Sequence, residues 1–279
     1  MREIDVRLVT EKVRSLFLDA VCNLGEDVYT LLREGLAKEE SPYGQEVLRQ
    51  LIRNAEIARS HHSPICQDTG MAVLFAEIGQ DVHFTGGDLN EAIEEGVRRA
   101  YHDGCFRASV LDPLLRKNTG DNTPAIVHYS IVPGDSVRLT AAPKGFGSEN
   151  MSALKCFAPA VGEEGVKDFV VETVRLAGAN PCPPVIVGVG IGGTAEKAML
   201  LAKHSLTRDA GTHSADPHLR DMEVELLERI NRLGIGPGGL GGRITALAVH
   251  IEQFPTHIAS LPAAVNMQCH AARHKSCTL

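Results

Sequence analysis

The sequence predicts a mixed α/β (α+β) fold that forms a single domain over residues 1–279. Apolar residues make up 43% of the chain, which is enough to build a substantial core. Helical and strand-like patterns alternate irregularly, and no internal repeat or long linker divides the chain. We therefore expect interleaved helices and short strands, with the functional site in the irregular loops between them.

Two helices are predicted early in the chain. Apolar residues between Val13 and Val21 recur at the spacing of one helix face. Ser41 and Pro42 provide an N-cap and a first helical residue for a second helix that continues to about residue 60. A helical apolar stripe follows this start, so both segments are expected to pack against a core.

Short strands and a third helix are expected next. Residues 71–78 and 82–84 have the composition of strands. Asp88, with Glu91 three residues later, matches a capping box, so the third helix should begin there and run to about residue 101.

The middle of the chain contains a hairpin signal. Strands are predicted over 125–132 and 137–142, and Pro133-Gly134-Asp135-Ser136 between them is typical of a turn. We expect these two strands to pair with each other in antiparallel fashion. The second half is expected to hold helices over about 165–176, 194–204 and 219–233, and strands over 185–189 and 244–251.

Charge and hydropathy exclude two classes of partner. The chain has 28 basic and 35 acidic residues, a net charge of −7, and no basic run that would follow a nucleic acid backbone. Residues 176–195 and 254–272 carry no Asp, Glu, Lys or Arg, but their prolines, glycines and polar residues do not suit a lipid-facing helix. We interpret both as buried active-site segments. The charged N-terminus lacks a signal-peptide core, which predicts a cytoplasmic protein.

The seven cysteines are scattered and include no CxxC pair, which argues against a disulfide framework or a small zinc finger. Buried thiols, a catalytic thiolate, or ligands that converge from distant segments remain possible. Cys66, Cys182 and Cys269 lie in segments rich in glycine or proline, whereas Cys22 lies within a predicted helix.

Four segments combine potentially reactive or ligand-binding residues with glycines and prolines that predict irregular backbone. Each of them also has a purely structural interpretation. Asp-Thr-Gly occurs in ordinary turns, glycine pairs in tight turns, and single histidines and cysteines in cores. The spacing of Gly188, Gly190 and Gly193 superficially resembles a nucleotide-binding motif, but no acidic residue ends a second strand about 20 residues later, as such a site requires. The four segments are residues 63–70, 144–150, 181–194 and 254–270.

Taken together, these segments resemble the α subunits of the two-subunit, iron–sulfur (class I) fumarate hydratases, whose relatives include the α subunit of L(+)-tartrate dehydratase. The family's triple glycine is here Gly145-Phe146-Gly147. The second region of single-chain members is not found in this sequence. The matching motifs, in order, are Cys66-Gln67-Asp68-Thr69-Gly70, Asn118-Thr119-Gly120, Lys144-Gly145-Phe146-Gly147-Ser148, Ala179-Asn180-Pro181-Cys182-Pro183-Pro184, Ile191-Gly192-Gly193-Thr194, and His257 twelve residues before Cys269.

The resemblance implies a 4Fe–4S cluster held by Cys66, Cys182 and Cys269, with one iron not ligated by protein. It implies reversible hydration of fumarate to malate, with Asp68 as the general base. A small dicarboxylate would be bound by Gln67, Arg107, Gly147 and His257, and by residues of a β subunit in a hetero-oligomer.

Three alternatives remain open at this stage. Dehydration of tartrate to oxaloacetate uses the same chemistry. An electron-transfer protein would need a fourth cluster ligand from Cys105, Cys156 or Cys277. A structural or metal-scaffold subunit would not need Asp68 or His257.

Overall fold

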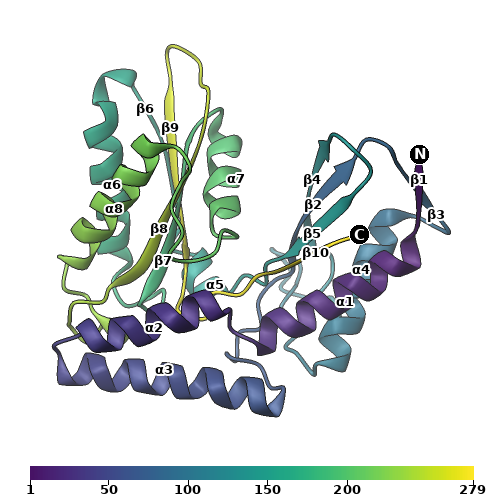
Figure 1. The fold of residues 1–279 in the computed structure, drawn as a ribbon, viewed down its shortest axis with the longest axis horizontal. Helices are drawn as coiled ribbons and strands as arrows, with labels where there is room; N and C mark the ends of the chain where they lie inside the picture. Colours follow the sequence, from purple (N-terminus) through teal and green to yellow (C-terminus); the bar gives the residue numbers. More distant parts are fainter. The chain divides into compact units, whose positions relative to one another are not determined.

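A computed structural model describes all 279 residues (Figure 1). The chain forms two compact units, each built from separate segments. The first contains Met1–Gly25, Ala55–Phe146 and Arg273–Leu279; the second contains Glu26–Asn54 and Gly147–Ala272. The mixed α/β class with interleaved helices and short strands is confirmed. That the whole chain folds as one domain stays a prediction.

The first unit contains a four-stranded sheet in the order β10-β5-β2-β4. β1 and β3 form a separate two-stranded parallel sheet. Asp5 and Asp88 cap α1 and α4 by accepting the backbone N–H groups of Arg7 and Glu91, so the predicted N-cap at Asp88 is confirmed. The elements are β1 (Arg2–Asp5), α1 (Val6–Cys22), β2 (Val73–Gly79), β3 (Val82–Thr85), α4 (Leu89–Asp103), β4 (Ile126–Val132), β5 (Val137–Ala141) and β10 (Lys275–Thr278).

One prediction about this sheet was wrong. β4 and β5 do not pair with each other, because β2 lies between them, parallel to β4 and antiparallel to β5. The chain does reverse direction at Pro133-Gly134-Asp135-Ser136. The backbone groups of the turn are bonded instead to the end of β2, where Gly79 donates its N–H to the Ser136 carbonyl over 2.8 Å. A turn signal fixes the reversal but not the partner of each strand.

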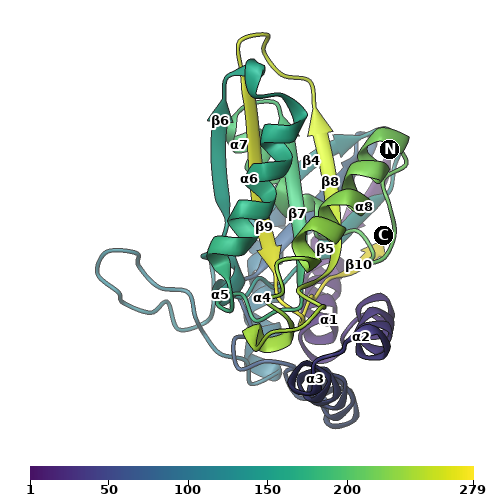
Figure 2. The same ribbon diagram turned by 90° about the vertical axis from the view of Figure 1, so that its left-hand side faces the viewer.

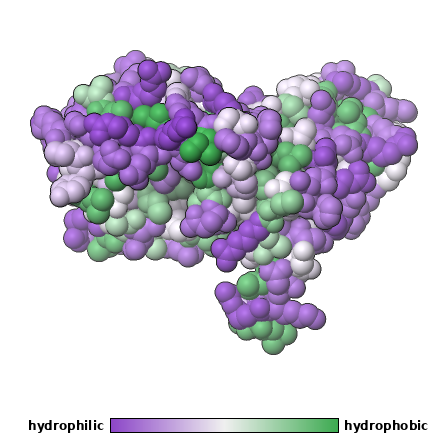
Figure 3. Space-filling model, turned by 90° about the horizontal axis from the view of Figure 1, so that it is seen from below, coloured by the Kyte–Doolittle hydropathy of each residue, from purple (hydrophilic) through white to green (hydrophobic).

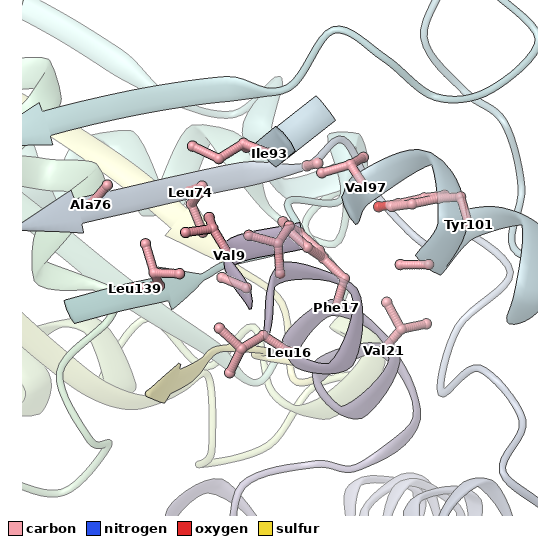
Figure 4. Packing of buried hydrophobic residues seen from close by; sticks show 14 of the residues in the cluster. Val9, Leu16, Phe17, Val21, Leu74, Ala76, Ile93, Val97, Tyr101 and Leu139 are labelled. Carbon is pink, nitrogen blue, oxygen red and sulfur yellow. The ribbon is translucent and has the colours of Figure 1, made fainter. Parts of the chain in front are cut away.

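The core of the first unit lies between α1, α4 and the sheet (Figure 4). Phe17 of α1 and Tyr101 of α4 contact each other, with ring centroids 6.3 Å apart. Leu74 of β2 and Leu139 of β5 are fully buried in the same cluster. The helical spacing read in residues 13–21 therefore identifies the buried face of α1.

In the second unit, helices cover both faces of the four-stranded sheet β6-β9-β7-β8 (Figure 1). Alternate residues of β7 and β9 face α6 and α8 on one side, and α7 covers the other side. α3 begins in this unit and ends in the first. The elements are α2 (Glu26–Lys38), α3 (Pro42–His61), α5 (Phe146–Glu149), β6 (Ala153–Phe157), η1 (Pro159–Val161), α6 (Gly162–Ala177), β7 (Val185–Gly192), α7 (Ala195–Ser205), α8 (Pro217–Asn231), η2 (Pro237–Gly239), β8 (Ala246–Phe254) and β9 (Leu261–Gln268).

The glycines of β7 serve helix packing. A Cβ on Gly188 would lie 2.1 Å from the carbonyl oxygen of Ala202, and one on Gly190 would lie 2.0 Å from that of Ala198. Both partners belong to α7, so the missing side chains let the helix approach the strand closely. This agrees with the interpretation of the glycine spacing as something other than a nucleotide site.

Between α4 and β4 the chain extends outward (Figure 2). Asp112 Oδ1 accepts the backbone N–H groups of Leu114 and Leu115, whose side chains are exposed. The face seen in Figure 3 mixes hydrophilic and hydrophobic residues. No helix combines the length and the apolar character that crossing a bilayer requires.

Candidate active site

The motif Cys66-Gln67-Asp68-Thr69-Gly70 forms an irregular turn between α3 and β2. Cys66 and Asp68 are half-buried, and Gln67 is exposed. Gly70 has a φ of +85°, and a Cβ there would lie 2.8 Å from the backbone nitrogen of Lys144. The glycine thus lets two backbone segments meet where a side chain would separate them.

The carboxylate of Asp68 is held by two backbone amides. Oδ1 accepts the N–H of Gly70 over 3.0 Å, and Oδ2 accepts the N–H of Phe146 over 2.8 Å. Met71 and Lys144 exchange two backbone hydrogen bonds of 3.0 and 2.9 Å, which bring the segment 144–146 alongside the turn. Each carboxylate oxygen keeps a lone pair beyond the one used here. Asp68 is therefore oriented and still able to accept a proton.

The backbone of the turn is supported from α4 and from the segment before β4. The hydroxyl of Tyr101 donates to the carbonyl of Gly70 over 2.8 Å, and Asn122 Nδ2 donates to the same carbonyl over 3.2 Å. Burial raises the pKa of Tyr101 well above its ordinary value, so its hydroxyl remains a donor at neutral pH.

Arg107 lies next to this turn. Its backbone N–H donates to Thr69 Oγ1 over 3.1 Å, and the Thr69 hydroxyl is 3.3 Å from the Arg107 carbonyl. Arg107 itself is exposed. The structure thus brings Gln67, Asp68 and Arg107 together within the first unit.

The second unit brings together Gly147, Cys182 and the end of β9. The ideal Cβ position of Gly147 is 3.6 Å from the carbonyl oxygen of Asn180. His270 Nδ1 is 3.0 Å from the carbonyl oxygen of Cys182, so Cys182 lies close to the residue that follows Cys269. Cys182 has a φ of 55°, a left-handed conformation held between two prolines. All three candidate cysteines lie in irregular backbone, as predicted.

His257 lies apart from these residues. It is exposed in the loop between β8 and β9, and its Nδ1 accepts the N–H of Ala259 over 3.2 Å. Cys269 follows the other end of β9. At the rise of an extended strand, β9 spans roughly 23 Å. The structure therefore does not bring His257 to Cys269 within this unit.

Sequence reasoning missed Arg273. This side chain is only 2% exposed, and its Nη1 donates to the carbonyl oxygen of Asp68 over 3.0 Å. It is also the residue that ends the uncharged run 254–272. The prediction that residues 254–272 are buried was wrong for the first part of the run, because residues 254–259 are exposed at the end of β8 and in the loop before β9. A charge placed directly after the uncharged run was the available signal for Arg273, but nothing in the sequence links it to a turn 205 residues earlier.

The thiols at Cys66, Cys182 and Cys269 are chemically suited to a cluster. None of the seven cysteines forms a disulfide, and these three are half-buried or exposed. Burial raises the thiol pKa of both Cys22 and Cys277, which disfavours the thiolate that metal binding requires. Soft thiolates in irregular backbone are typical ligands of iron–sulfur clusters. Cys66 belongs to the first unit, and Cys182 and Cys269 belong to the second.

Known proteins resemble the chain over nearly its whole length. A family model described as fumarate hydratase (Fumerase) matches residues 10–278. "Putative L(+)-tartrate dehydratase subunit alpha" of Methanocaldococcus jannaschii is 44% identical over 271 residues, which cover 95% of each chain. L(+)-tartrate dehydratase subunit alpha of Escherichia coli strain UTI89 is 32% identical over 272 residues, 96% of this chain and 89% of its own. The protein of the same name from strain K12 is 31% identical with the same coverage.

Proposed function

The chain belongs to the fumarate hydratase (Fumerase) family, and from this premise we propose that it is the α subunit of a hydro-lyase that reversibly hydrates fumarate to malate. The observation that carries the proposal is the carboxylate of Asp68, held by the N–H groups of Gly70 and Phe146 beside the exposed Gln67 and Arg107. A carboxylate held in one orientation, with free lone pairs, is suited to take a proton from a carbon next to a carboxylate group.

We assign the remaining residues by the same chemistry. The guanidinium of Arg107 would pair with a carboxylate of the substrate, and Gln67 and the backbone at Gly147 would provide further hydrogen bonds. His257 stays a predicted substrate contact, although within the second unit it lies beyond the far end of β9 from Cys269.

Cys66, Cys182 and Cys269 would hold a 4Fe–4S cluster with one iron not ligated by protein. When bound, such a group supplies a Lewis acid that makes hydroxide a feasible leaving group. The task of Asp68 is then to move the proton, and that of Arg107 and Gln67 is to orient the dicarboxylate.

A second candidate is dehydration of L(+)-tartrate to oxaloacetate, which is favoured by the names of the relatives at 44% and 32% identity. Both reactions remove or add water next to a carboxylate, and the residues described above serve either. The relatives are named α subunits, so we propose that a β subunit supplies the rest of the substrate contacts in a hetero-oligomer, in the cytoplasm.

The test is reconstitution. The chain and a β-type partner subunit are produced without oxygen, loaded with iron and sulfide, and assayed separately and together against fumarate, malate and L(+)-tartrate. We expect negligible turnover by the chain alone and strong turnover of fumarate and malate by the pair. Preference for tartrate would replace the first candidate with the second. Turnover of none of the three would refute the proposed function.

A further inference from the structure

Arg273 is buried against the turn that carries Asp68. Its side chain is 2% exposed, and Nη1 donates to the Asp68 carbonyl oxygen over 3.0 Å. Its Nε–H is buried and has no hydrogen-bond acceptor. Burying a guanidinium with an unused donor costs free energy. Stability alone therefore does not explain why an arginine occupies this position.

The guanidinium and the carboxylate of Asp68 face the same glycine. A Cβ on Gly145 would lie 3.3 Å from Asp68 Oδ2 and 3.4 Å from Arg273 Nη2. The missing side chain of Gly145 thus lets both groups approach its Cα closely. The neighbouring residue, Phe146, donates its N–H to the same Oδ2 over 2.8 Å.

Arg273 also lies close in sequence to a candidate cluster ligand. It follows Cys269 by four residues and is the first residue of the last segment of the first unit. Asp68 follows Cys66 by two residues. The hydrogen bond from Arg273 to the Asp68 carbonyl therefore joins two residues that each follow a candidate cluster ligand within four positions of the sequence.

We propose that Arg273 is a positioning residue for Asp68. It fixes the backbone of the turn and places a positive charge beside the carboxylate, while the N–H groups of Gly70 and Phe146 set the direction of the two oxygens. The planar guanidinium presents donors in fixed directions, which a lysine ammonium does not. The catalytic part of this proposal rests on the proposed function, whereas the positioning part does not.

The positioning part is tested by hydrogen–deuterium exchange of the full-length chain. Arg273→Gln removes the charge and the donor fork. We expect the amides of Gly70 and Phe146 to exchange about tenfold to a hundredfold faster, the range that a charge-assisted hydrogen bond is worth. Amides of β2, such as those of Leu74 and Phe75, should keep their rates. Unchanged exchange at Gly70 and Phe146 would overturn the proposal, and so would equal acceleration throughout β2.

Two further variants keep the test decisive if Arg273→Gln does not fold. Gly145→Ala keeps Arg273 but puts a methyl group in tight contact with both Nη2 and Oδ2, so it should accelerate the same two amides. Arg273→Lys keeps the charge and should give a smaller acceleration than Arg273→Gln. Arg208→Gln removes another arginine with a buried, unpartnered Nε, in the second unit, and should leave both amides unchanged.

The catalytic part is tested in the reconstituted pair of subunits, with turnover expressed per bound iron. Arg273→Gln should lower kcat about tenfold to a hundredfold and leave KM within about threefold, because misplacing a catalytic group chiefly affects the transition state. A raised KM with parental kcat would contradict positioning of the base. If the parent pair turns over no dicarboxylate, the proposed function fails, and the exchange measurement still decides the role of Arg273.

Discussion

Phe146 donates its backbone N–H to Oδ2 of Asp68 over 2.8 Å, across 78 residues of sequence. This bond joins two motifs that are far apart in the chain. The glycine-containing segment 144–147 supplies a donor to the carboxylate, and the turn at residues 66–70 supplies the carboxylate itself. Its second oxygen is held by Gly70, so neither oxygen of Asp68 can be changed without losing a contact.

The first prediction concerns the carboxylate. Asp68→Asn should lower turnover by about two to four orders of magnitude while the protein still binds iron. Because an amide has only one acceptor oxygen, the variant should also lose one of the two backbone bonds and about 1–2 kcal/mol of stability. Rates, iron content and urea unfolding are measured together.

Asp112→Asn is the matched control. Both of its backbone donors, from Leu114 and Leu115, bond to a single oxygen, which an asparagine can reproduce. It should therefore change neither the rate nor the stability appreciably. Parental turnover in an iron-loaded Asp68→Asn variant would remove Asp68 from the role of base.

The second prediction concerns the thiols. Serine at Cys66, Cys182 or Cys269 should abolish the iron content after anaerobic reconstitution, which in the parent should be about four irons per chain. Serine at Cys22 or Cys277 should not, since burial raises the pKa of both thiols and they lie in α1 and β10. Iron analysis and the visible absorption spectrum are the measurements. A cluster that survives all three ligand changes would contradict the assignment.

The third prediction is a pH dependence from Glu39. Glu39 is 2% exposed, and its carboxylate accepts the backbone N–H groups of Glu40, Ser41, Arg243 and Ile244. Burial raises the pKa of Glu39, but the four backbone bonds together more than offset this and hold it below its usual range. A lowered pKa in the folded state gives stability that is present above the unfolded pKa and is lost as the pH falls through the folded value.

Glu39→Gln should therefore cost about 2–3 kcal/mol at pH 7. The difference from the parent should shrink as the pH is lowered below about 4.3, the ordinary value for glutamate. Urea unfolding from pH 3 to pH 8 measures both. Glu40→Gln, an exposed neighbour, is the control. A penalty that does not change with pH would mean that the charge of Glu39 contributes nothing.

The fourth prediction concerns the contact between β7 and α7. Gly190→Ala should destabilise the protein by about 3 kcal/mol, because its methyl group would overlap the carbonyl oxygen of Ala198. Gly134→Ala, in the turn between β4 and β5, is the comparison: a Cβ there meets no atom within 4 Å, so any cost comes from its φ of +97° and not from overlap. A Gly190→Ala variant as stable as the parent would show that close packing against α7 does not constrain this position.

Local patterns determined most of the helices. The apolar spacing of residues 13–21, the cap at Asp88 and the Ser41-Pro42 start each correspond to an observed helix, because amphipathic spacing and caps depend on residues a few positions apart. α2 was missed; only Val28, Leu32 and Gly35 are buried in it, a weak apolar stripe. β9 lies within the predicted active-site segment 254–272 and has no strand signal of its own, since a strand covered on both faces shows no alternation of polar and apolar residues.

The sequence by itself determined the family, and it predicted the thiols and Asp68 as candidate site residues, because all of these are carried by short motifs. Only the tertiary structure decided that β2 lies between β4 and β5, that Phe146 and Arg273 hold Asp68, and that β9 separates His257 from Cys269. The physical reason is how far apart in the sequence the interacting residues lie. Caps, turns and helix faces are set by neighbouring residues, whereas strand partners and buried charge contacts depend on which distant segments the whole core brings together.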